Sequence, residues 1–269
     1  MTRGSKRVGL LLVAGALLIM TAFAAFAVGL HRQALWQVVR ACVADFKLTT
    51  APYPCLAVNL SGGEERGYVV LRPPLMHDLI LSPTRQIVGI EDQFLRLPDA
   101  PAYFDAAWRA RSFLADAGGR PPNRDSVALV VNSAAERTQD QLHIHIGCLL
   151  PTVQRAIAAT APRVQIAGWT QLTSVVRHIV FWGMRIRGTD LAEVDPFRLV
   201  AGEFADKVRD MGNLTIMVAA VRAEGEDGFL ILASYLGAPH SWWSVGDNEL
   251  IGPHCPTDAG PDVPPLHDG

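Results

Sequence analysis

The sequence predicts an α+β protein with an antiparallel sheet and flanking helices, preceded by one N-terminal transmembrane helix. Three observations predict this architecture. Strand-like segments occur in pairs joined by polar or glycine-containing loops, segments with helical spacing lie between them, and a long charge-free run opens the chain. The chain has 269 residues, which is enough to bury a sizeable core.

The N-terminal run carries no charged residue from Val8 to Leu30. It is slightly longer than the roughly 20 residues that a helix needs to cross the hydrocarbon core of a membrane. Arg3, Lys6 and Arg7 precede the run. Because basic residues stay on the cytoplasmic side, the rest of the chain is expected on the exported side. The run therefore predicts a membrane anchor that carries an exported domain.

A cleaved signal peptide is the alternative interpretation of this run. Ala22-Phe23-Ala24 and Ala25-Phe26-Ala27 both fit the small-x-small pattern of a cleavage site. Both interpretations export the domain, so they predict the same organisation. Residues 1–30 form the anchor or signal, residues 31–255 the folded domain, and residues 256–269 a disordered tail.

The elements of the domain follow from local spacing and from the residues that end each segment. Leu35, Val39 and Val43 lie on one face of a predicted helix, whereas Pro73-Pro74 and Pro83 end two apolar strands. The predicted strands cover residues 67–71, 78–82, 126–132, 142–149, 214–221 and 229–233. The predicted helices cover residues 31–50, 150–165 and 197–211, and a further helix runs from Pro101 to Gly118-Gly119. The last four strands are expected to form two antiparallel hairpins.

The charge balance argues against one class of partner. The formal net charge is −2 and the isoelectric point is about 6.4. Proteins that bind nucleic acid usually present an excess of basic residues to the phosphate backbone. Nucleic acid is therefore not an expected partner.

All four cysteines, Cys42, Cys55, Cys148 and Cys255, follow the apolar run. An even number of cysteines in an exported chain predicts two disulfides. Three connectivities are possible; Cys42–Cys55 is the natural local pair, which leaves Cys148–Cys255 to tie the tail to the core. Buried free thiols are the alternative. A zinc site is disfavoured because the sequence has no C-x-x-C pair.

The segment Gln141-Leu142-His143-Ile144-His145-Ile146 has the pattern of a strand with two different faces. Alternate side chains of a strand share a face, so the apolar residues are expected in the core and the glutamine and histidines on the other face. A rigid row of imidazoles suits phosphoryl chemistry, in which one ring attacks phosphorus while its neighbours orient it and transfer protons.

Three other interpretations of His143 and His145 stay open at this point. The pair could be without function on a solvated face, or it could belong to a binding site without catalysis. His-x-His also occurs in zinc and iron sites. A metal site would need a third ligand, for which His77, His178 and His254 are available but show no informative spacing.

The order of strands and motifs resembles the histidine-triad (HIT) superfamily. The run from Leu79 to Arg85 is similar to its strand-proline-basic element, and Asn132 and Thr138 match its pattern before the histidine strand. Asn132-Ser133, Arg137-Thr138-Gln139 and the histidine strand resemble more closely the CDP-diacylglycerol pyrophosphatase family. The N-terminal anchor, residues 67–71, Pro196-Phe197 and the four cysteine positions agree with that family.

The resemblance implies a HIT-like fold and a role for each motif residue. His143 takes the central position, which is the nucleophile, and His145 takes the third. The first position is usually histidine, whereas here it is Gln141, which can orient by hydrogen bonds but cannot accept a proton at neutral pH. Asn132 and Thr138 match positions that contact ribose and phosphate. Arg137 lies in the same loop and is a candidate for a bidentate phosphate contact.

The implied activity is hydrolysis of CDP-diacylglycerol to CMP and phosphatidate through a cytidylyl intermediate on His143, with no metal and no cofactor. The anchor would confine the enzyme to the membrane that holds its lipid substrate. A bacterial-type inner membrane, with the catalytic domain on the periplasmic side, is the expected location. The alternatives are a broader nucleotide pyrophosphate hydrolase or nucleotidyl transferase, and a non-catalytic sensor of nucleotides or lipid headgroups.

Overall fold

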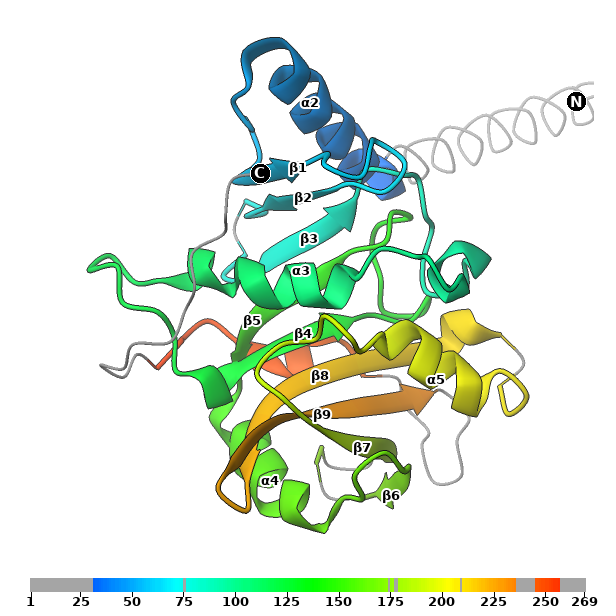
Figure 1. The fold of residues 1–269 in the computed structure, drawn as a ribbon. Coiled ribbons are helices and arrows are strands. Elements are labelled where there is room, and N and C mark those ends of the chain that lie inside the picture. Colours follow the sequence, from blue (N-terminus) through cyan, green and yellow to red (C-terminus); the bar gives the residue numbers. More distant parts are fainter. Residues whose placement is uncertain are drawn as a thin grey trace, which may run out of the picture.

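The computed structural model describes residues 31–74, 76–173, 175–176, 179–208, 210–235 and 245–256. Within these residues, ten strands form one sheet in which every strand pair is antiparallel (Figure 1). The order is β1-β2-β3-β5-β4-β8-β9-β7-β6, and β10 pairs with β5 beside this path. The α+β class with an antiparallel sheet is therefore confirmed.

The strands vary from two to ten residues in length. Their bounds are β1 Ala57–Asn59, β2 Tyr68–Leu71, β3 Leu79–Pro83, β4 Val127–Val131, β5 Ile144–Leu149, β6 Thr170–Leu172, β7 Phe181–Arg187, β8 Leu214–Ala223, β9 Glu226–Tyr235 and β10 Ile251–Gly252. The two expected hairpin pairings are present as β4–β5 and β8–β9. β1, β6 and β10 have two or three residues, which is too short for an alternation to be recognised in the sequence.

Four α-helices of the described residues pack on the sheet: α2 Ala34–Thr49, α3 Tyr103–Ala110, α4 Pro151–Thr160 and α5 Pro196–Phe204. The largest apolar cluster joins α3 and α5 to one face of the sheet. The opposite face carries two separate clusters, one under α2 at β2 and β3 and one under α4 at β4, β8 and β9. This division matters because His145 lies between the two clusters, opposite Ile80 on one side and Val130 on the other.

Three predicted helices are shorter than expected. The helix predicted over residues 150–165 is an α-helix from Pro151 to Thr160, followed by one 3-10 turn, Ala161–Arg163. The helix that begins near Pro101 ends as an α-helix at Ala110 and continues as one 3-10 turn, Arg111–Leu114. The helix predicted to reach residue 211 ends at Phe204, and the chain continues in turns in which the backbone N–H groups of Lys207 and Val208 both donate to the Phe204 carbonyl. The helix predicted over residues 31–50 is confirmed, and it buries Leu35, Val39 and Val43 as expected.

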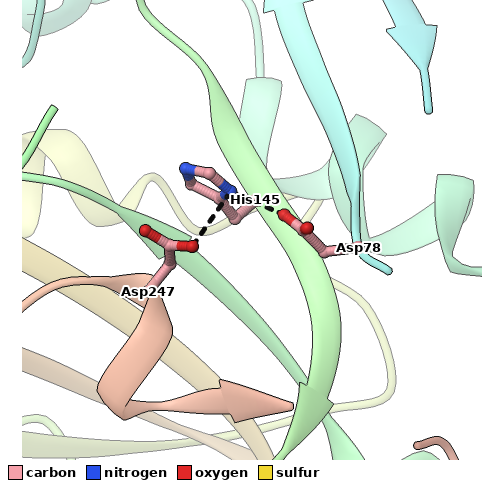
Figure 2. Close-up of side chains that lie close together, drawn as sticks. All are labelled: Asp78, His145 and Asp247. Carbon is pink, nitrogen blue, oxygen red and sulfur yellow. Dashed lines mark hydrogen bonds and ion pairs between the residues drawn. The ribbon is translucent and has the colours of Figure 1, made fainter. Parts of the chain in front are cut away.

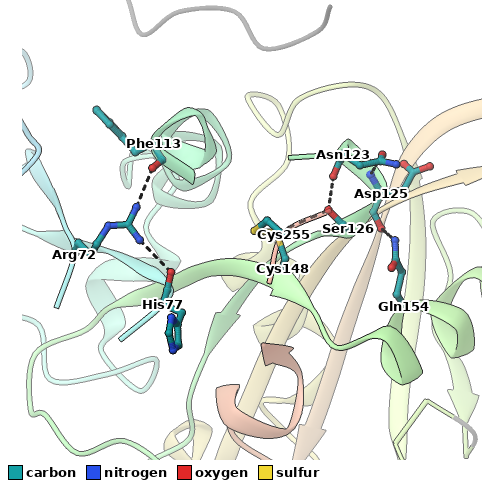
Figure 3. The surroundings of a disulfide bond; sticks show 9 residues. All are labelled: Arg72, His77, Phe113, Asn123, Asp125, Ser126, Cys148, Gln154 and Cys255. Atoms are coloured by element: carbon teal, nitrogen blue, oxygen red, sulfur yellow. Dashed lines mark hydrogen bonds between the residues drawn. A yellow bond between two sulfur atoms is a disulfide. The ribbon is translucent and has the colours of Figure 1, made fainter. Parts of the chain in front are cut away.

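Both predicted disulfides are present, Cys42–Cys55 and Cys148–Cys255. The first links α2 to the loop before β1. The second ties the C-terminal segment to β5, where Ser126 Oγ lies 3.8 Å from Cys148 Sγ (Figure 3). The backbone N–H of Asn123 also donates to the Pro256 carbonyl. Residues 245–256 are thus held across the end of β5.

Within the part of the chain that the structure describes, no helix is both long and apolar enough to cross a membrane. The anchor predicted over residues 1–30 lies outside the described residues, as does the predicted tail from residue 257 onward.

Candidate active site

The histidine strand lies in the interior of the sheet, with β3 on one side and β4 on the other. Leu142, Ile144 and Ile146 belong to the main apolar core, which confirms the expected alternation. His143 directly precedes β5 and His145 is within it. The two rings lie 4.8 Å apart between centroids and are only 8% and 3% exposed. The interpretation of a solvated histidine face is therefore wrong.

His143 is held in one orientation by the backbone. Its Nδ1 lies 2.7 Å from the carbonyl oxygen of Gln141. Because a carbonyl only accepts, Nδ1 carries the hydrogen, and the neutral ring then has its lone pair on Nε2. Burial, reinforced by the neighbouring His145, lowers the pKa of His143 to about 4. The ring is accordingly neutral at physiological pH, which is the form that attacks an electrophile.

His145 lies between two buried carboxylates (Figure 2). Its Nδ1 is 2.6 Å from Asp78 Oδ2 and 3.7 Å from Asp247 Oδ2. Asp78 lies just before β3, two residues ahead of Ile80, so it shares the face of His145. Asp247 comes from the C-terminal segment that crosses β5. The carboxylates fix the ring and favour an N–H at Nδ1.

Asn132, which follows the last residue of β4, lies next to this group. Its amide donates to Asp247 Oδ1 over 2.6 Å, and its oxygen accepts from the Asp247 backbone N–H over 2.9 Å. The same amide nitrogen lies 3.5 Å from Nε2 of His145. Asn132 therefore orients Asp247 and lies beside the nitrogen of His145 that faces away from the carboxylates.

Gln141 is also at the site, but its side chain is fully buried and its bonds are internal. The amide group donates to Ser82 Oγ, the Pro83 carbonyl and the Arg85 carbonyl, over 3.2, 3.0 and 3.0 Å. Its oxygen accepts from the Ile87 backbone N–H over 3.3 Å. Gln141 thus binds the chain after β3 with its side chain and orients His143 with its carbonyl.

The structure brings Arg137 to the site and leaves Thr138 exposed at the surface. Arg137 makes a bidentate ion pair with Glu91, over 2.9 and 2.7 Å. Its buried Nε makes no hydrogen bond within the described residues and lies 3.7 Å from Asp140 Oδ1. Beside His143 is a cavity of 10 Å³, room for about one water molecule. It is lined by Val88, Gly89, Val131, Asn132, Arg137, Gln141, Leu142 and His143.

A larger groove of 290 Å³ lies on the carboxylate side of the site. Asp78, Asp247 and His77 line it, together with Asn248 and the strand β10. His145 itself lines neither hollow. Its Nδ1 faces Asp78 and Asp247, which line the groove, and its Nε2 lies near Asn132, which lines the small cavity.

The residues that could hold a metal ion in the structure differ from those expected from the sequence. Of the predicted third ligands, His77 and His254 are exposed and lie outside the group around His145, and His178 is outside the described residues. Among the described residues, Asp78, His145 and Asp247 come close enough to surround a cation. However, the 2.6 Å contact between Asp78 and His145 has the length of a hydrogen bond, so the observed geometry is that of an oriented imidazole.

Comparison with known proteins bears on this site. The family model for CDP-diacylglycerol pyrophosphatase matches residues 30–254. The chain belongs to the CDP-diacylglycerol pyrophosphatase family. It is also similar to a CDP-diacylglycerol pyrophosphatase of Yersinia pestis, with 36% identity over 208 residues, which is 76% of this chain and 77% of the relative. The resemblance to the CDP-diacylglycerol pyrophosphatase family, a family of hydrolases, is thus confirmed. Every site residue from Asp78 to Asp247 lies inside the matched range.

Asp78 and Asp247 are the site residues that the sequence analysis missed. A signal for Asp78 existed, because it is the first residue of the strand predicted over residues 78–82 and shares a face with Ile80, opposite Leu79 and Leu81. No local pattern marks Asp247, which lies 115 residues after its partner Asn132.

Proposed function

We propose that this CDP-diacylglycerol pyrophosphatase family member hydrolyses CDP-diacylglycerol to CMP and phosphatidate through a covalent intermediate on His143. The observation that carries the proposal is the state of His143. Its Nδ1 is held by the Gln141 carbonyl, its pKa is lowered to about 4, and its Nε2 lone pair is available. The family membership supports the substrate.

The proposed reaction has two steps. The lone pair of His143 Nε2 attacks the cytidylyl phosphorus, a P–N bond forms, and the bridging P–O bond breaks to release phosphatidate. Water then attacks the same phosphorus, the P–N bond breaks, and CMP leaves with the ring neutral again. The covalent route divides one difficult displacement into two easier ones. The Gln141 carbonyl stabilises the positive charge that Nδ1–H carries while phosphorus is attached.

The remaining motif residues are proposed to bind the substrate. Arg137 and Asn132 line the cavity beside His143 and present donors to a diphosphate. Since Glu91 holds Arg137 by two hydrogen bonds, a phosphate contact would use the buried Nε or would share the guanidinium with Glu91. Thr138, at the surface of the same loop, would contact the outer part of the nucleotide.

We also propose a membrane location with the catalytic domain exported. The charge-free run Val8–Leu30 and the two disulfides support it, since disulfides persist in oxidising compartments. Extraction of membranes with alkaline carbonate should leave the protein in the pellet. A mature N-terminus near Val28 would indicate a cleaved signal peptide instead. The assignment to the HIT-like superfamily fold stays a prediction.

The decisive experiment uses CDP-diacylglycerol labelled in the cytidylyl phosphate. Wild-type protein should release labelled CMP and unlabelled phosphatidate, and quenched protein should carry label on the peptide that contains His143. His143→Ala should lose nearly all turnover and all label, whereas His254→Ala, an exposed histidine away from the site, should behave as wild type.

Several outcomes would contradict the proposal. Binding of substrate without any turnover would favour the sensor interpretation, and equal turnover of other nucleotide diphosphates would favour a broader hydrolase. Full activity of His143→Ala, with loss of activity on addition of a chelator, would support a metal-dependent reaction.

A further inference from the structure

The two carboxylates beside His145 have no role in the steps given above, although both are buried and both point at the same nitrogen. We propose that Asp78 and Asp247 are positioning residues that hold His145 as the base for the water of the second step. This inference rests on the proposed covalent route through His143.

The hydrogen-bond directions assign the two nitrogens of His145 to different tasks. The carboxylate of Asp78 only accepts, so it requires the hydrogen on Nδ1, 2.6 Å away. The lone pair is then on Nε2, on the side of Asn132 and of the cavity next to His143. The Asn132 amide is 3.5 Å from Nε2, a weak contact that an incoming water can replace.

The second carboxylate, Asp247, stabilises the imidazolium form of His145 that is present after the ring accepts a proton. An imidazolium in a buried site is costly unless an opposite charge lies close to it. Asp247 Oδ2 is 3.7 Å from Nδ1. Asn132 fixes Asp247, because its amide donates to Oδ1 of that carboxylate and its oxygen accepts from the Asp247 backbone N–H. The positive ring would lie between Asp78 and Asp247, so both carboxylates favour the transfer of a proton to Nε2.

The chemistry of the two steps indicates that His145 acts as a base in the second step, the attack of water, and not in the first. Phosphatidate leaves as a phosphate monoester, whose second pKa is about 6 as for other alkyl phosphates, and it therefore departs without help from an acid. Water has a pKa of about 15.7 and is a poor nucleophile unless a base removes its proton. In the proposed step the water oxygen forms the new P–O bond, its proton goes to His145 Nε2, and the electron pair of the P–N bond returns to His143.

The test compares the release of the two products by the full-length protein. Asp78→Asn and Asp247→Asn are the variants, and Asp99→Asn, an exposed aspartate paired with Arg66, is the matched control. With Asp78→Asn, we expect a burst of phosphatidate equal to the enzyme present, followed by CMP release slowed by about 100-fold, the typical effect of losing a general base. Label on the His143 peptide should accumulate. Asp247→Asn should show the same pattern more weakly, and Asp99→Asn should show no change.

A parallel loss of both products in Asp78→Asn, with no burst and no added label in a folded protein, would overturn the inference. If Asp78→Asn does not fold, the inference is tested with Asp247→Asn and with the solvent deuterium isotope effect on the wild-type protein. An isotope effect on CMP release but not on the first release of phosphatidate supports the base, and its absence refutes it. Failure of the proposed function is distinct, because the wild type would then never carry label on His143.

Discussion

At the scale of single residues, the protonation state of His143 should set the acidic limit of activity. Its pKa lies at about 4, below the ordinary value of 6.5, because burial and the neighbouring His145 disfavour the charged ring while Asp78 and Asp247 only partly compensate. Since the neutral ring is the nucleophile, kcat/KM should stay high as the pH falls below 6.5 and should decrease only toward pH 4. A pH–rate profile of the free enzyme measures this. A decrease centred near 6.5 would contradict the assignment.

Gln141 gives a second prediction at this scale. The histidine-triad superfamily, which the sequence resembles, usually has histidine at this position, so the resemblance predicts that Gln141→His is tolerated. The structure predicts otherwise, because the buried amide satisfies three acceptors and one donor between residues 82 and 87. A ring cannot replace all four bonds, and the loss should lower the free energy of unfolding by about 2 kcal/mol or more. Urea unfolding measures it, with the partly exposed Gln139→His as control.

At the scale of elements, the start of the described chain is bound to the loop that precedes the histidine strand. Arg32 makes a bidentate ion pair with Asp140, and the Asp140 backbone N–H donates to the Arg32 carbonyl over 2.8 Å. Gln139 accepts from the Leu35 backbone N–H and donates to the His31 carbonyl. Residues 31–35, which follow the predicted anchor, thus lie directly against residues 137–140, immediately before Gln141.

This contact predicts a local effect of Arg32→Ala. The pair is partly exposed, so the loss in global stability should be small, about 1 kcal/mol or less. Hydrogen exchange at residues 138–140 should nevertheless become faster, because the loop loses its main restraint. Arg40→Ala, which changes an exposed arginine of α2, is the control and should leave exchange there unchanged. Unaltered exchange in Arg32→Ala would show that other contacts hold the loop.

At the scale of the whole molecule, the C-terminal segment crosses β5 and brings Asp247 to the site. Its strand β10 pairs with Leu149 and Cys148, and the Cys148–Cys255 disulfide fixes its end. This disulfide spans 107 residues, whereas Cys42–Cys55 spans 13. The chain-entropy relation therefore predicts that the longer link stabilises the protein by about 2 kcal/mol more than the shorter one.

The two links should also differ in their effect on activity. Replacing Cys148 and Cys255 with serine should lower both stability and turnover, since Asp247 loses part of its support. Replacing Cys42 and Cys55 with serine should lower stability and leave turnover almost unchanged, because that link lies at α2 and β1, away from His145. Thermal unfolding and CMP release of the two double variants provide the measurement. Equal effects on turnover would show that the segment does not depend on its disulfide.

The sequence by itself determined what depends on neighbours along the chain. The two-residue period of a strand placed Leu142, Ile144 and Ile146 in the core and both histidines on the opposite face, and the periodic apolar residues of α2 predicted its buried side. The even number of cysteines predicted two disulfides and left three connectivities open, of which the structure has the one that contains the local pair Cys42–Cys55. The strand alternation and the helix face are local features, so no knowledge of strand order was needed for them.

Only the tertiary structure decided how the histidines are used. Pairing of β3 with β5 brings Asp78 to His145 across 67 positions, and the disulfide-bound C-terminal segment brings Asp247 to Asn132 across 115. Burial of His143 and the internal bonds of Gln141 likewise depend on which strands are neighbours. Groups distant in the chain produce the lowered pKa of His143, the fixed orientation of the His145 ring and the buried carboxylate pair beside it. The periodicity of a single strand carries no information about these three features.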